Sequence, residues 1–116
     1  KPDEFPYGNV DELAKELQEL EELPELFVCA NDFLAISIIN SLKKLGKRVP
    51  QDIQVMGFDN TVDARNYEIP LTTIDTDKEV LGNESIVTLL SRVKYKEDRN
   101  RIIYLKTSPI YRESTK

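Results

Sequence analysis

Short apolar runs alternate with segments of helical periodicity along most of the chain. The apolar runs lie at 26–30, 53–58 and 71–75, and the helical segments at about 9–22, 32–45 and 77–93. Consecutive strands joined by helices are parallel, because only a crossover connection of that length can join parallel neighbours. The pattern therefore predicts an α/β fold with a parallel sheet and helices on both faces. The continuous apolar run at 26–30 is typical of a strand buried on both of its faces.

Residues typical of helix caps lie at the ends of the helical segments. Gly46 follows the second segment, where a left-handed C-cap is expected. Thr76 and Glu79 fit the capping box T-x-x-E at the start of the third. The run 101–107 alternates weakly, and we expect it to be the last strand, at a sheet edge because Pro109 follows it.

The composition excludes several classes of function. The 116 residues suit one domain, and a net charge of −5 argues against a dedicated nucleic-acid surface. Histidine is absent from the sequence, so Ser-His and Cys-His pairs and His-based metal sites cannot form. We therefore expect no catalytic residue, metal or cofactor. The single cysteine, Cys29, indicates a reducing compartment, and no apolar run approaches the roughly 20 residues of a membrane span. Because the chain begins at Lys1 and its one methionine is Met56, we expect it to be a piece of a longer protein.

Polar pairs follow two of the predicted strands. Asn31 and Asp32 end the first, and Asp59 and Asn60 end the second. In parallel sheets, ligands bind beyond the carboxyl ends of the strands, so these pairs predict a binding edge. The alternative is local: Asp32 caps its helix and Asp59 caps a turn. Both interpretations can hold together if Asp32 caps while Asn31 points outward.

The order of short motifs adds a resemblance. The chain contains an apolar strand, A-N-D, a helix, V-P-Q-D, G-F-D-N, P-L-T-T, a helix with L-G, and R-E-S-T. Together these motifs, from Leu26 to Lys116, resemble the effector-binding domain of LacI/GalR-type transcriptional repressors. The resemblance implies the carboxyl-terminal lobe of a type I periplasmic-binding-protein-like fold, in which a ligand is held between two lobes. It also implies a helix-turn-helix headpiece for operator DNA, which this chain lacks.

The same resemblance divides the chain. Residues 1–75 and 101–116 correspond to the carboxyl-terminal lobe, and 76–100 to a segment that packs on the missing amino-terminal lobe. Asp75 and Thr76 would form a hinge. We expect the apolar face of helix 77–93 to be covered, either by its own sheet or by another chain, because exposed aliphatic patches associate strongly. That face gathers Ile86, Leu89, Leu90 and Val93.

Some site residues can be carried over by position. Asn31 matches a position that faces the effector, and Asp59 matches one that binds sugar hydroxyls. Phe33 lies where a ring could cover a flat ligand, although core packing is an equal alternative. Thr76 matches a hinge-side position that can touch ligand, with helix capping as its alternative role.

A dimer surface is also implied. Ile36 lies nearly opposite the core stripe of helix 32–45, and Ile39 lies on the neighbouring arc. The family uses this helix surface for dimerisation, together with the segment before P-L-T-T, here Tyr67 and Ile69. The expectation is a two-fold homodimer with Ile36 facing outward; a lone exposed apolar residue is the alternative.

The leading function is therefore a cytoplasmic, non-enzymatic sensor domain of a repressor. It binds a sugar-like small molecule, and it contacts operator DNA only through the missing headpiece. An exported solute-binding protein of related fold is the alternative, and an α/β enzyme a distant third. G-F-D-N-T also occurs in catabolite-control members, which read a phosphorylated partner protein, but the basic surface for that is not evident around helix 77–93.

Overall fold

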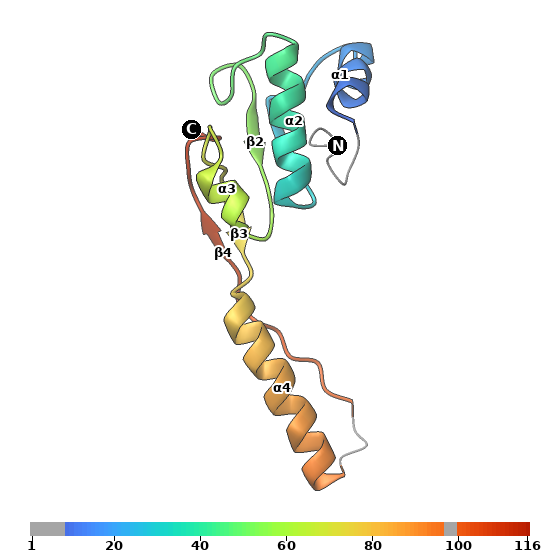
Figure 1. The fold of residues 1–116 in the computed structure, drawn as a ribbon, viewed down its shortest axis with the longest axis vertical. Helices are drawn as coiled ribbons and strands as arrows, with labels where there is room; N and C mark the ends of the chain where they lie inside the picture. The colour runs from blue at the N-terminus through green and yellow to red at the C-terminus, as the bar shows by residue number, and fades with distance from the viewer. Residues whose placement is uncertain (1–8, 97–99) are drawn as a thin grey trace. The chain divides into compact units, whose positions relative to one another are not determined.

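The computed structural model describes residues 9–96 and 100–116. The chain divides into two compact units. The first runs to Asp75 and resumes with Pro109–Lys116, and the second is Thr76–Ser108. Figure 1 shows the elements of both units in their chain order.

Helices and strands alternate as the sequence predicted, with one addition. In order they are α1 Val10–Glu19, β1 Leu26–Val28, α2 Asp32–Lys44, β2 Gln54–Met56, α3 Val62–Asn66, β3 Thr73–Asp75, α4 Lys78–Tyr95 and β4 Ser108–Ile110. The short helix α3 lies in a stretch that the sequence pattern left irregular. Its N-cap is Thr61, whose Oγ1 accepts a hydrogen bond from Ala64 N at 3.2 Å.

The two-stranded sheet of β1 and β2 is parallel, which confirms the prediction of a parallel sheet. β1 pairs with β2, with Leu26 opposite Gln54 and Val28 opposite Met56. A parallel bridge between Met56 and Thr72 extends the arrangement toward β3. β3 and β4 form a second two-stranded sheet.

The core of the first unit lies around α2, which packs against β2, α1 and α3. Its buried apolar residues are Leu17, Cys29, Ala35, Ile38, Ile39, Leu42, Val49, Ile53, Val55, Ala64 and Leu71. A hydrogen bond also holds α1 against α2. Ser41 Oγ, fully buried on α2, lies 3.0 Å from Val10 O at the start of α1.

The structure corrects two expectations about strands. Leu26 and Val28 are 43% and 71% exposed, so one face of β1 is open, although the apolar run suggested burial on both faces. Residues 101–107 contain no strand, and Pro109 lies within β4 instead of after the last strand.

The carboxyl-terminal tail joins two segments that are far apart in sequence. Ser114 is fully buried, and its Oγ donates to Val55 O at 2.6 Å and accepts from Thr72 N at 2.8 Å. Its backbone accepts from Val55 N at 3.0 Å and donates to Pro70 O at 3.1 Å. The tail therefore fastens β2 to the segment that leads into β3.

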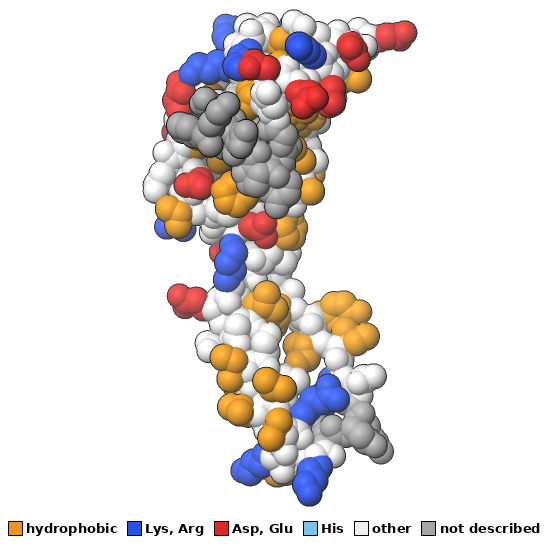
Figure 2. All heavy atoms as spheres, turned by 45° about the vertical axis from the view of Figure 1, so that its right-hand side comes forward, with side chains coloured by type: hydrophobic (Ala, Val, Ile, Leu, Met, Phe, Trp, Pro, Cys, Tyr) orange, Lys and Arg blue, Asp and Glu red, His pale blue; other side chains and the backbone are white. Residues whose placement is uncertain are grey.

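In the second unit, α4 contains no buried residue. One side of the helix, with Leu81, Ser85 and Thr88, shares a groove of about 220 Å³ with the returning segment 101–105. The opposite arc is exposed, and Figure 2 shows hydrophobic side chains gathered on this unit. The exposed fractions are 59% for Ile86, 61% for Leu89, 62% for Leu90 and 70% for Val93. The coverage of this face, by the chain's own sheet or by another chain, stays a prediction.

Candidate functional site

Asn31 lies between β1 and α2, and it is the N-cap of α2. Its Oδ1 accepts a hydrogen bond from Leu34 N at 2.9 Å. The expectation that Asp32 caps this helix is therefore wrong, because the neighbouring amide occupies the cap. Asn31 is partly buried, and its side chain carries an NH₂ donor group in addition to the oxygen that makes the cap.

Asp32 points into the protein and is fully buried. Its Oδ1 accepts from Thr73 Oγ1 at 2.6 Å and its Oδ2 from Thr61 N at 2.7 Å. Its own N–H donates to Phe58 O at 2.9 Å. One carboxylate thus ties the start of α2 to the loop after β2 and to β3, at the edge where the strands end.

Gly57 leaves the space that this carboxylate occupies. A Cβ at Gly57 would lie 2.3 Å from Asp32 Oδ1 and 2.8 Å from Leu71 Cδ2. Real atoms do not approach so closely, so the glycine of G-F-D-N is required by packing. The close approach places the next two residues of the loop at the same edge as Asn31.

Asp59 and Asn60 form a turn with unusual backbone geometry. Their φ angles are 104° and 49°, in the left-handed region that residues other than glycine seldom adopt. Asp59 N donates to Ile74 O at 3.0 Å, and Asn60 N donates to Thr73 Oγ1 at 3.3 Å. Such strained positions cost on the order of 1–3 kcal/mol each and gather at functional sites.

The other two predicted ligand residues differ in their settings. Phe33 is partly buried in the first turn of α2, where its carbonyl accepts from Ser37 Oγ at 3.0 Å. Thr76 belongs to the second unit and does not cap α4. Asp77 is the N-cap, and its Oδ1 accepts from Val80 N at 3.1 Å. The capping alternative for Thr76 is therefore wrong. Its contact with ligand stays a prediction.

Two of the predicted dimer residues are not at the surface. Ile36 is 3% exposed and Ile39 is 1% exposed, so the expectation that Ile36 faces outward is wrong. Asn40, which shares the face of Ile36 one turn later, accepts a hydrogen bond from the Tyr67 hydroxyl at 2.6 Å. The chain's own segment after α3 therefore occupies this side of α2.

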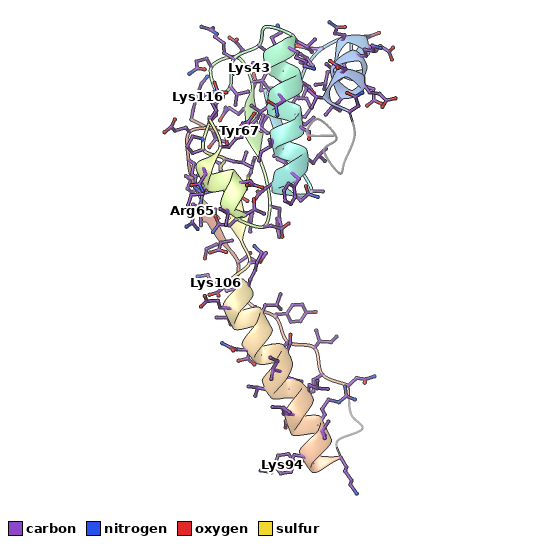
Figure 3. All side chains as sticks on the ribbon, viewed as in Figure 1. Lys43, Arg65, Tyr67, Lys94, Lys106 and Lys116 are labelled. Atoms are coloured by element: carbon purple, nitrogen blue, oxygen red, sulfur yellow. The ribbon has the colours of Figure 1, made fainter. Side chains whose placement is uncertain are left out.

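Tyr67 and Ile69 are partly buried and remain at the edge of that contact. Lys43 Nζ, on α2, lies 2.7 Å from the carboxylate of Glu68. Figure 3 labels Lys43, on α2, and Tyr67, just after α3. Burial raises the pKa of the Tyr67 hydroxyl, so it stays a protonated donor to Asn40 at neutral pH. We call the side chains of Asn40, Lys43, Tyr67, Glu68 and Ile69 together the α2–Ile69 surface.

Cys29 is the only thiol, and it is buried at the end of β1. Burial raises its pKa to about 11, so the thiol is protonated at neutral pH. A protonated thiol is a poor nucleophile and metal ligand. Cys29 is therefore a packing residue.

Two grooves of the first unit are lined by residues other than Asn31 and Asp59. The larger one, of about 550 Å³, is bordered by the end of α1, the connection to β1 and the loops before β2. Another, of about 260 Å³, lies between Ile39, Lys43, Val49 and Ile69. Among residues 9–96 and 100–116, no cluster of acidic or cysteine side chains has the make-up of a metal site. Nor does any helix in those ranges have the length and apolarity to cross a membrane.

Comparison with known proteins identifies the family. A family described as a periplasmic binding protein-like domain matches residues 2–115. The chain belongs to the periplasmic-binding-protein-like domains of LacI/GalR-type regulators. The HTH-type transcriptional repressor PurR of Photobacterium profundum is 34% identical over 113 residues, which are 97% of this chain and 34% of the relative. By its name, this relative is a transcriptional repressor.

Two solved structures show the same fold. The Lac repressor dimer bound to operator and the anti-inducer ONPF has a TM-score of 0.81 at 29% identity, covering 91% of this chain and 37% of that one. A LacI family regulator from Enterococcus faecium with bound ribose has a TM-score of 0.79 at 27% identity, covering 92% and 39%. This LacI-type chain thus spans between a third and two fifths of the length of these proteins.

Sequence reasoning missed two residues of this edge. Thr73 binds the Asp32 carboxylate, and Arg112 binds Asn60. Both lie in motifs of the LacI-type pattern, Thr73 in P-L-T-T and Arg112 in R-E-S-T. Their place in these motifs could have marked them as candidate site residues. Their bonding partners could not be predicted, because Asp32 and Asn60 are distant from them in sequence.

Proposed function

We propose that this chain is the ligand-sensing and dimerisation part of a cytoplasmic LacI/GalR-type transcriptional regulator. Its ligand is a sugar or a related small polar molecule. The observation that carries the proposal is the strained Asp59–Asn60 turn beside Asn31, at the carboxyl edge of the parallel strands. Ligands bind at this edge in open α/β sheets, and strain of this kind is kept where function needs it.

The chemistry of the edge suits neighbouring hydroxyl groups. A carboxylate accepts more than one hydrogen bond, so Asp59 can receive two adjacent hydroxyls of a sugar ring. The Asn31 side chain uses its oxygen for the helix cap, which leaves amide hydrogens as donors to a ligand oxygen. Phe33 adds an apolar surface nearby in sequence, and Thr76 a hydroxyl at the hinge.

The division of the chain supports a two-lobed mechanism. We assign the first unit to the carboxyl-terminal lobe and the second to contact with an amino-terminal lobe, through Ile86, Leu89, Leu90 and Val93. Ligand between the lobes favours their closure and so changes the operator affinity of a headpiece, a coupling free energy between two sites. The α2–Ile69 surface is the proposed contact of a homodimer. The repressor names of the relatives favour this function over an exported solute-binding protein.

Replacing Asp59 with alanine in the full-length protein should weaken ligand binding at least tenfold while leaving the fold intact. Each ligand hydroxyl that loses its acceptor costs about 1–3 kcal/mol. Calorimetric titration with D-ribose, followed by other neutral mono- and disaccharides, measures the effect. Asp63→Ala is the matched control, because Asp63 is an exposed acid on α3. This variant should bind the sugar with the same affinity as wild type. Equal affinities for wild type and Asp59→Ala would remove Asp59 from the site.

A further inference from the structure

Arg112 connects the carboxyl-terminal tail to the Asp59–Asn60 turn. Its Nη2 donates to Asn60 Oδ1 at 2.7 Å, and its Nη1 donates to Leu71 O at 2.7 Å. The side chain is partly buried. One guanidinium therefore joins the turn after β2 to the segment just before β3.

The backbone that carries the Arg112 side chain is itself held in place. Arg112 N donates to Thr72 Oγ1 at 2.8 Å, and the buried Ser114 holds the tail to both Val55 and Thr72. A guanidinium on an anchored backbone loses little freedom when it binds, because its fork is planar and pre-organised. The tail thus offers a rigid support to the turn.

The turn needs such support. Both Asp59 and Asn60 have positive φ, and conformations of this kind persist only where the surroundings over-determine them. The backbone bond of Asn60 to Thr73 Oγ1 is long, at 3.3 Å, whereas the side-chain bond from Arg112 is short and charge-assisted. Arg112 is therefore the stronger of the two restraints on Asn60.

We propose that Arg112 is a positioning residue for ligand binding, which holds the Asp59–Asn60 turn so that the Asp59 carboxylate is presented to a hydroxylated ligand. The proposal rests on the function proposed above, since it assumes that Asp59 is the acceptor. Arg112 acts through Asn60 and is not itself assigned a contact with ligand. The fork is essential to the role, because lysine has a single charged nitrogen and cannot reach Asn60 Oδ1 and Leu71 O in the same way.

The first test measures the turn without any ligand. Hydrogen exchange of the full-length protein, followed by mass spectrometry, compares peptides covering 57–61 and 36–44 in wild type, Arg112→Met and Arg112→Lys. We expect exchange in 57–61 to accelerate about tenfold in both variants, with 36–44 unchanged. Arg65→Met, at an exposed arginine on α3, is the control and should behave as wild type. Unchanged exchange in 57–61, or equal acceleration in both peptides, would overturn the positioning role.

The second test asks whether Arg112 acts through Asp59. With D-ribose or whichever neutral sugar binds wild type, Arg112→Met should raise Kd about tenfold, which corresponds to about 1.4 kcal/mol. In an Asp59→Asn background the same change should raise Kd less than about twofold, because the carboxylate that Arg112 positions is already gone. Fully additive effects would show a merely structural role and overturn the proposal. If no sugar binds wild type, the proposed function fails, while the exchange test still decides whether Arg112 holds the turn.

Discussion

Replacing Asp32 with alanine should lower the free energy of unfolding by about 3–5 kcal/mol. The change leaves Thr61 N and the buried Thr73 hydroxyl without their acceptor, and each unsatisfied buried donor costs about 1–3 kcal/mol. It also opens a cavity beside Gly57, in the space that the carboxylate fills. Urea denaturation followed by circular dichroism gives the change in stability.

Two further variants make the Asp32 result specific. Asp32→Asn keeps one carbonyl acceptor and should cost less than Asp32→Ala. Asp63→Ala removes an exposed acid and should stay within about 0.5 kcal/mol of wild type. A loss below about 1 kcal/mol for Asp32→Ala would show that the carboxylate does not hold these segments together.

Replacing Ile36 with aspartate should unfold the first unit or lower its stability by about 4 kcal/mol or more. The side chain is 3% exposed, so the change removes apolar burial and places a carboxylate where it loses its hydration. Helix content by circular dichroism, measured at a concentration where the protein is monomeric, should fall. Ile36→Val keeps the apolar surface and should cost only about 0.5–1.5 kcal/mol.

The Ile36 experiment also separates two interpretations of this helix. If Ile36→Asp weakened self-association while helix content stayed at the wild-type level, the residue would be an outward-facing dimer contact, as its place in the sequence suggested. The buried position predicts the reverse. A dimer contact on this side would then depend on the partly buried residues of the α2–Ile69 surface, such as Tyr67.

The alternation of apolar and helical segments was enough to predict the parallel sheet, because that inference needs only local periodicity. The details of the edge needed distant partners. Asn31 and Asp32 are both capable caps, and the choice between them depends on Thr61 and Thr73, which lie 29 and 41 residues beyond Asp32. Local sequence does not contain that information.

The error at Ile36 has a similar origin. Helical periodicity assigns one face of α2 to the sheet and leaves the opposite face to solvent or a partner. Tyr67 and Glu68 fill part of that opposite face by bonding to Asn40 and Lys43, and the sequence gives no periodic sign of this. The strained turn at Asp59 and Asn60 could not be predicted either, because aspartate and asparagine adopt ordinary backbone angles at most positions in proteins.

The first unit is interrupted in sequence, since its chain leaves at Asp75 and returns at Pro109. Contacts between distant parts of the sequence close it: the pairing of β3 with β4 and the bonds of Ser114 to Val55 and Thr72. The entropy of closing a loop grows only logarithmically, by about 0.6 kcal/mol for each doubling of its length. A change in the length of the connection between α4 and β4 should therefore cost the closure of the first unit little free energy.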